Sequence, residues 1–235
     1  MHDDLALGSM TPALCFTGIS MEDLQNDIQR RYQAKADACR MLSACYYEPE
    51  EAFLEEDIFG QLVQALSALD SECTAEAQAM GECFREISQE DLRIDYTRLF
   101  LGPINIRSKP YGSVYLDGGN VVMGNSTMVV MALYREGGFH VAEAFTEMPD
   151  HVAVELEFLY LLNARLGDGH TETNERGRLA ALERSLLGEH LGQWIIPFTE
   201  AMKKGSHTEF YGKLADLTRR FVLDALRQPV RAPLP

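Results

Sequence analysis

The chain has 235 residues, of which 46% are hydrophobic and 24% charged. This balance is typical of a folded globular domain and argues against intrinsic disorder. Its 36 acidic and 21 basic residues give a formal net charge of −15 at pH 7. A surface of that sign repels nucleic acid and anionic membranes and attracts cationic partners, so we exclude nucleic-acid binding.

The cysteines and the N-terminal segment indicate the compartment. The five cysteines are odd in number and form no C-x-x-C pair, which indicates a reducing compartment and gives no zinc site. No lysine or arginine precedes Arg30, so the basic start of a secretory signal is absent. No apolar stretch reaches the roughly 18 residues of a membrane-spanning helix. We therefore expect a cytoplasmic protein that is not inserted into a membrane.

The first half of the chain predicts acidic, amphipathic helices. Residues 1–20 contain glycine and proline without periodicity, and we expect a flexible N-terminal arm there. Apolar residues then recur at spacings of three and four through residues 21–47, 53–69 and 73–87, which is the helical period. Thirteen acids and a single base, Arg85, fall between residues 41 and 91. These helices should form a strongly negative surface.

The next helix carries an aromatic and aliphatic stripe. It starts near residues 89–91, presents Tyr96, Leu99 and Phe100 on one side, and stops at Gly102, which a proline follows. The stripe predicts either ordinary core packing or one wall of a binding groove.

A glycine-rich segment, residues 102–124, comes directly after this helix. We expect it to be non-helical, and long loops inside compact domains are commonly functional. Tyr111 and Tyr115 lie within it. Because aromatic side chains around an open loop often line recognition grooves, they favour a groove over simple core packing.

The second half of the chain predicts further helices. One begins at Asn125 or Ser126 as N-cap and ends at a glycine pair, and another spans residues 150–166, with Asp150 close to its first free N–H groups. Two more helical stretches precede a proline-rich tail at residues 229–235: residues 178–204, which we expect to divide near Gly188 and bend at Pro197, and residues 207–227. With no strand pattern, the expected fold is all-α, a single-domain bundle of about eight to ten helices over residues 21–228.

The helix over residues 150–166 contains a polar pair within its apolar face. At 100° per residue, His151 and Glu155 lie within about 60° of each other among valines and leucines. Either the two side chains hydrogen-bond each other in the core, since an unpartnered buried group costs about 1–3 kcal/mol, or they line a binding site. We expect Trp194, the single tryptophan, in the core.

No enzyme motif accompanies these residues. Glu147, His151, Glu155 and Glu157 cluster in sequence, but a di-iron bundle needs two Glu-x-x-His motifs and none occurs. A Gly-x-Ser-x-Gly elbow and a phosphate-binding G-x-x-x-x-G-K loop are also absent. We therefore expect no enzymatic activity, no metal and no cofactor.

Four ordered motifs resemble those of the TorD/DmsD/NarJ family of molybdoenzyme chaperones. They lie between residues 30 and 225, and each is weak alone but specific as part of the ordered set. The motifs are Tyr96-x-x-Leu99-Phe100-x-Gly102, Pro110-Tyr111-Gly112-Ser113-Val114-Tyr115, Pro149-Asp150-His151 with Glu155-Leu156-Glu157-Phe158, and His190-Leu191-x-x-Trp194-x-x-Pro197-Phe198.

The resemblance implies a cytoplasmic, all-helical chaperone. Such a protein binds the twin-arginine leader, or another terminal segment, of a molybdopterin-dependent oxidoreductase precursor before cofactor insertion and export. The peptide-binding residues that it implies here, to which our own analysis adds Glu155, are Tyr96, Leu99, Phe100, Gly102, Tyr111, Tyr115, Asp150 and His151.

Two departures and several alternatives remain. Tyr96 stands where some relatives have tryptophan, and the family's glutamate before Pro-Asp-His is displaced to Glu147, which leaves the peptide preference open. An assembly factor that binds a folded metalloenzyme without reading a leader is the alternative, and a metal-dependent helical enzyme is a third. The sequence leaves open the client, a monomer or a domain-swapped homodimer, and binding of the pterin cofactor or a nucleotide.

Overall fold

The computed structural model describes residues 20–102, 106–118, 122–141, 147–228 and 230. Most of these residues are helical, and they contain no strand apart from an isolated antiparallel bridge between Tyr111 and His151. The helices, in chain order, are α1 (Met21–Ala44), α2 (Ala52–Glu55), α3 (Ile58–Ala68), α4 (Thr74–Glu86), α5 (Gln89–Tyr96), α6 (Gly112–Leu116), α7 (Asn125–Gly137), α8 (Val152–Leu166), α9 (Thr173–Ser185), α10 (Gly192–Gly205) and α11 (Glu209–Arg227). Nine of these have eight or more residues, which confirms the predicted all-α bundle.

Local sequence explains where several helices begin and end. Ser20 and Ser88 have extended backbones before α1 and α5, and each side chain accepts a hydrogen bond from the N–H three residues later, at 3.0 and 3.1 Å. Gly138, with φ of 78°, ends α7 in the left-handed conformation that glycine adopts at no steric cost. Asp57, with φ of 50°, separates α2 from α3 within the predicted helix 53–69.

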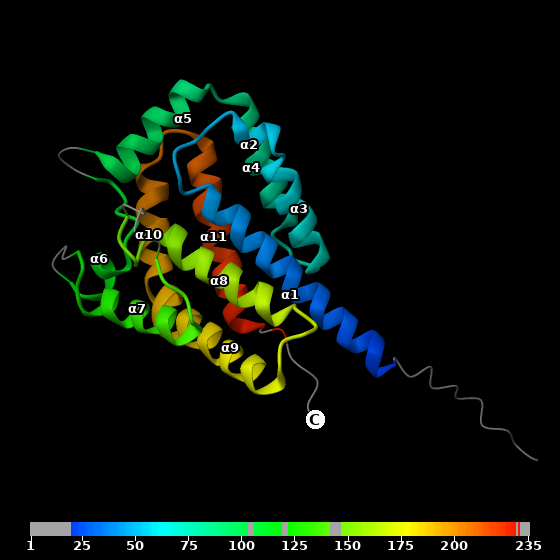
Figure 1. The fold of residues 1–235 in the computed structure, drawn as a ribbon. Coiled ribbons are helices and arrows are strands. Elements are labelled where there is room, and N and C mark those ends of the chain that lie inside the picture. The colour runs from blue at the N-terminus through cyan, green and yellow to red at the C-terminus, as the bar shows by residue number, and fades with distance from the viewer. Residues whose placement is uncertain (1–19, 103–105, 119–121, 142–146, 229, 231–235) are drawn as a thin grey trace, which may run out of the picture.

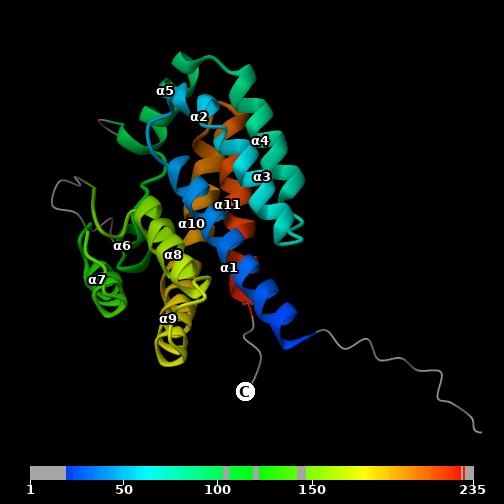
Figure 2. The same cartoon turned by 45° about the vertical axis from the view of Figure 1, so that its right-hand side comes forward.

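Two helices, α1 and α8, form the middle of the bundle (Figures 1 and 2). They pack along each other, and the fully buried Ala36 and Ala38 of α1 carry side chains small enough for close packing. The pair α3 and α4 lies on one flank, while α6 and α7 lie at the opposite one. No helix among the described residues is long and apolar enough to cross a membrane.

Two π-helical turns extend α5 and precede α10. The first, η1 (Thr97–Leu101), continues α5 and carries the Leu99 and Phe100 stripe, and the second, η2 (Leu186–Leu191), joins α9 to α10. The second turn contains Gly188, where the sequence predicts a division of helix 178–204. Such turns are frequent at functional sites because they redirect side chains from the α-helical register.

The core contains the predicted tryptophan. Trp194 is fully buried and packs against Phe198, with ring centroids 5.3 Å apart. Cys39, Cys45 and Cys73 are buried free thiols, and burial raises the pKa of both Cys39 and Cys45 to about 12. These thiols therefore behave as small apolar core residues.

Three predictions of local structure need correction. Residues 112–116 of the predicted loop form α6. The N-cap of α7 is Gly124, not Asn125 or Ser126. The Ser126 N–H donates to the Asp117 carboxylate, so a side chain from outside the helix satisfies it. The helix predicted from residue 150 begins at Val152, and His151, not Asp150, accepts from one of its first free N–H groups. The predicted arm at residues 1–20 and the tail at residues 229–235 lie almost entirely outside the described residues.

Candidate functional site

The fold brings the predicted site residues into one contiguous region. An aromatic chain runs from Tyr96 to Phe100, with ring centroids 5.3 Å apart, and on to Phe198 at 6.4 Å. From Phe198 it continues to Tyr115 at 6.1 Å, which stacks on Trp194 at 5.8 Å. Residues of three separate sequence motifs thus meet beside α10.

Most of these side chains are inside the bundle. The exposed fractions are 0% for Leu99, Asp150 and Glu155, 3% for Phe100 and 4% for His151. Leu99 and Phe100 therefore form no wall of an open groove in this structure, because the stripe packs on α10 and α11. Gly102, Tyr111 and Tyr115 are half-buried and reach the surface.

A buried polar triad lies beneath the aromatic chain. Glu155 Oε1 is 2.9 Å from His190 Nε2, and Glu155 Oε2 accepts from Trp194 Nε1 at 3.3 Å. The predicted hydrogen bond between Glu155 and His151 is wrong. His151 instead caps its own helix, with Nδ1 accepting from the Ala153 N–H at 3.1 Å, while Glu155 points toward η2 and α10. His190 stands in one of the matched motifs, yet the sequence alone gave it no role.

Burial and neighbouring charge shift the pKa values of His190 and Glu155. Burial by itself lowers the pKa of His190, but the adjacent Glu155 carboxylate outweighs burial, and the pKa of His190 is raised above its ordinary value. Burial also raises the pKa of Glu155, against the opposing effect of His190. Burial therefore sets the direction at Glu155, while the Glu155 carboxylate sets it at His190 and favours a protonated His190 that donates to Glu155.

The triad predicts a loss of stability on the alkaline side. A raised folded-state pKa gives stability that is fully present below the unfolded value, about 6.5 for histidine, and is lost as pH rises through the folded value. We expect the free energy of unfolding to fall above about pH 6.5, by roughly 1 kcal/mol for each unit of raised pKa. Urea denaturation between pH 6 and pH 9 measures this. The His190→Gln variant should lack that component, and an identical slope in the variant would contradict the assignment.

The short helix α6 covers the triad. Its Gly112 N–H donates to the Asp150 carbonyl at 2.9 Å, and its Ser113 N–H donates to Asp150 Oδ2 at 2.7 Å. A Cβ at Gly112 would lie 3.0 Å from Trp194 Nε1 and 3.2 Å from His190 Nε2, so glycine permits this close approach. Asp150 therefore caps α6, rather than the helix that follows it.

At the surface above His151, two tyrosines meet two glutamates. Tyr47 stacks on the His151 ring at 6.4 Å, and Tyr111 meets the same ring edge-on at 5.4 Å. Tyr111 Oη donates to Glu147 Oε2 at 2.6 Å, and Tyr47 Oη donates to Glu157 Oε1 at 2.7 Å. All four residues are half-buried. We call Tyr47, Tyr111, Glu147 and Glu157 the tyrosine–carboxylate patch.

The charge of this patch is negative at neutral pH. Burial lowers the pKa of His151 to about 4, against the raising effects of Glu147 and Asp150, so its ring is neutral at pH 7. Tyr111 also stays neutral because burial and Glu147 raise its pKa. Two half-buried carboxylates thus lie beside aromatic rings with no cationic side chain hydrogen-bonded to them among the described residues, an arrangement that attracts cations.

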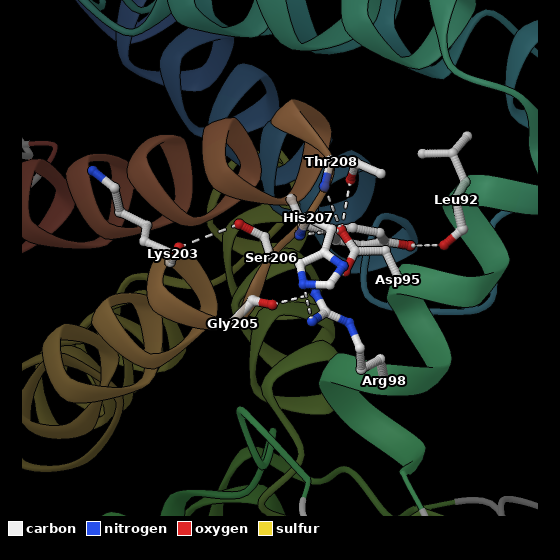
Figure 3. Close-up of polar contacts among 9 residues, drawn as sticks. Leu92, Asp95, Arg98, Lys203, Gly205, Ser206, His207 and Thr208 are labelled. Atoms are coloured by element: carbon white, nitrogen blue, oxygen red, sulfur yellow. Dashed lines mark hydrogen bonds and ion pairs between the residues drawn. The ribbon is translucent and has the colours of Figure 1, made fainter.

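A second polar cluster fixes the segment that carries Leu99 and Phe100 (Figure 3). Asp95 Oδ2 accepts from the N–H groups of His207 and Thr208 at 2.9 and 2.7 Å and from the Thr208 hydroxyl at 2.8 Å. Asp95 Oδ1 accepts from Arg98 at 2.7 Å, and Arg98 also donates to the Gly205 carbonyl. One buried carboxylate thus joins α5 to the turn between α10 and α11.

Comparisons with known proteins place this chain in a family. The family model described as "Nitrate reductase delta subunit" matches residues 66–200. The "Tat proofreading chaperone DmsD" of Salmonella typhi is 34% identical over 184 residues, which cover 77% of this chain and 83% of that protein. The chain belongs to the TorD/DmsD family of molybdoenzyme chaperones.

Two further proteins are more distant in sequence. The "Chaperone protein TorD" of Photobacterium profundum is 29% identical over 144 residues, covering 60% of this chain and 65% of that one. A crystal structure of a putative redox enzyme maturation protein from Archaeoglobus fulgidus covers 80% of this chain and 93% of its own, with a TM-score of 0.53 and 21% identity. That likeness shows the fold alone.

Membership in the TorD/DmsD family confirms the predicted family and the expectation of a chaperone rather than an enzyme. The described residues hold no group of three or more His, Cys, Asp or Glu side chains that could bind a metal ion. The peptide-binding roles of the predicted residues remain predictions. Sequence reasoning gave Tyr47 no role. It named Glu147 and Glu157 within the family motifs and as rejected metal ligands, but not as peptide-binding residues.

Proposed function

We propose that this protein binds the twin-arginine leader, or another terminal segment, of an apo-molybdoenzyme in the cytoplasm and holds it until the cofactor is inserted. The tyrosine–carboxylate patch carries this proposal. It lies directly over His151, where Tyr111 and the α8 N-terminus meet. The printed names of the relatives, Tat proofreading chaperone and chaperone protein, support the same function.

The chemistry of the patch suits an arginine side chain. A guanidinium group can donate to a carboxylate while its flat face packs on a tyrosine ring. Glu147 and Glu157 hold the two tyrosine hydroxyls, so the rings are oriented before a ligand arrives. Pre-orientation lowers the entropy cost of binding.

The patch supplies selectivity more than affinity. Exposed ion pairs contribute about 0–1 kcal/mol each, while a micromolar complex requires about 8 kcal/mol. Burial of one large apolar side chain contributes about 1.5–3 kcal/mol. Apolar contacts must therefore provide most of the affinity, with the carboxylates selecting cationic segments and raising the association rate.

The Glu147→Gln variant tests the patch. Its amide oxygen can still accept from Tyr111, so the ring stays in place while the negative charge is lost. We expect the dissociation constant for a synthetic peptide with two adjacent arginines to rise about 3- to 5-fold, measured by titration calorimetry. Glu82→Gln, an exposed change on α4, is the matched control and should bind as the wild type does. Equal affinity of both variants would argue against the patch.

A further inference from the structure

An apolar pocket lies between α7 and α8, beside the tyrosine–carboxylate patch. Its volume is about 220 Å³. Two polar residues, His140 and Glu157, line it, and the rest of the wall comes from Tyr134, Phe139, Val141, Val154, Phe158 and Leu161. An apolar cavity of about 150 Å³ suffices to bind benzene, so this pocket has room for a leucine or phenylalanine side chain.

Glu157 connects the pocket to the patch. Its Oε1 atom accepts from Tyr47 at 2.7 Å and from Ser43 at 3.3 Å. Among the described residues, no donor contacts its Oε2 atom, so this oxygen is free for a ligand. A carboxylate is therefore available at the edge of an apolar pocket, which complements a segment that carries a cation close to an apolar side chain.

An extended peptide has the spacing needed to contact both Glu157 and the pocket. Successive residues advance about 3.3 Å, and side chains at i and i+2 point to the same face. An arginine at Glu157 would thus place the side chain two positions later within reach of the pocket. An unbroken apolar ligand would leave the Glu157 charge without a partner, while a wholly polar one would leave the pocket unfilled.

We infer that the α7–α8 pocket binds the apolar side chain that follows the arginines of the client segment, while Glu157 binds an arginine. This inference rests on the proposed function and identifies the part of the surface that supplies affinity. The protein would then recognise an arginine and the apolar side chain that follows it at two adjoining places on its surface. A segment with arginines alone should bind more weakly.

Two peptides measure the contribution of the pocket. Both carry two adjacent arginines, and the positions that follow are leucine in one and serine in the other. We expect wild-type protein to bind the leucine peptide about 10- to 100-fold more tightly by titration calorimetry. Glu157→Gln should weaken both peptides by the same factor, because the charge is lost and the pocket is kept.

The Leu161→Trp variant blocks the pocket. Leu161 is half-buried on α8, so a larger side chain there can fill the pocket without entering the core. We expect the preference for the leucine peptide to fall to about 2-fold or less, with unchanged affinity for the serine peptide. Leu133→Trp, at a half-buried leucine of α7 outside the pocket lining, should keep the full preference. Leu161→Ser, which removes apolar wall without adding volume, should also lower the preference if the tryptophan variant loses its helical circular dichroism.

The outcomes separate this inference from the proposed function. A leucine preference that survives in both Leu161 variants would overturn the inference and leave the function intact. Equal affinity of wild-type protein for the two peptides would do the same. If neither peptide bound wild-type protein, both the proposed function and the inference would be overturned.

Discussion

Replacement of Asp95 by asparagine should lower the free energy of unfolding by roughly 3 kcal/mol. Asp95 is 2% exposed and accepts four hydrogen bonds, from Arg98, His207 and Thr208. An asparagine oxygen can replace only one carboxylate oxygen, and its NH₂ group would then face another donor. Urea denaturation followed by helical circular dichroism measures the change.

The pH dependence of this variant gives an independent check. Burial by itself raises the pKa of Asp95, but the hydrogen bonds from Arg98, Thr208 and His207 outweigh it and lower that pKa below its ordinary value. Stability from a lowered pKa is present above the unfolded value, about 3.9, and is lost as pH falls through the folded one. Wild-type protein should lose this component in acid, and Asp95→Asn should not. Glu90→Gln, an exposed change on the same helix, should stay within about 0.5 kcal/mol of wild type; a similar loss there would refute the special role of Asp95.

The Glu155→Leu variant should lose roughly 3–5 kcal/mol, because removal of one partner of a buried pair leaves the other uncompensated. His190 and the Trp194 N–H both donate to this carboxylate inside the bundle. Leucine is close in size, so the loss would come from unpaired polar groups rather than from a cavity. Chemical denaturation at pH 7 measures it.

A double variant separates charge from packing. Glu155→Leu combined with His190→Leu removes both members of the pair, and such apolar replacements are often neutral. We expect the double variant to recover at least half of the single-variant loss, with a residual cost from the Trp194 N–H. If the double variant lost as much unfolding free energy as the two single variants lose together, or more, the pairing would be contradicted.

Local periodicity predicted the long helices because each buries one apolar face. The helix at residues 150–166 shows how far such reasoning extends. Its period placed Glu155 inside the apolar arc, and the side chain is fully buried. Its partner, His190, lies 35 residues away on another segment, and no spacing within one helix indicates such a contact.

Helix α6, which the sequence did not predict, also depends on a contact between residues far apart in the chain. Glycine and proline around residues 110–119 favour a loop, but the Asp150 carboxylate, 37 residues away, caps Ser113 and stabilises a short helix. The tyrosine–carboxylate patch could not be predicted for the same reason. Tyr47 reaches His151 because α1 packs along α8. Aromatic motifs in the sequence indicated the region of the site, while the packing decided which of its side chains are buried.

Titration of wild-type protein with a leader peptide tests the central claim most directly. The peptide carries two adjacent arginines followed by an apolar run, and a second peptide has glutamine at both arginine positions. Calorimetry should show a micromolar or tighter complex with the first peptide and binding at least 10-fold weaker with the second. Absence of binding to the first peptide, or equal affinity for both, would contradict a cation-selective, segment-binding chaperone.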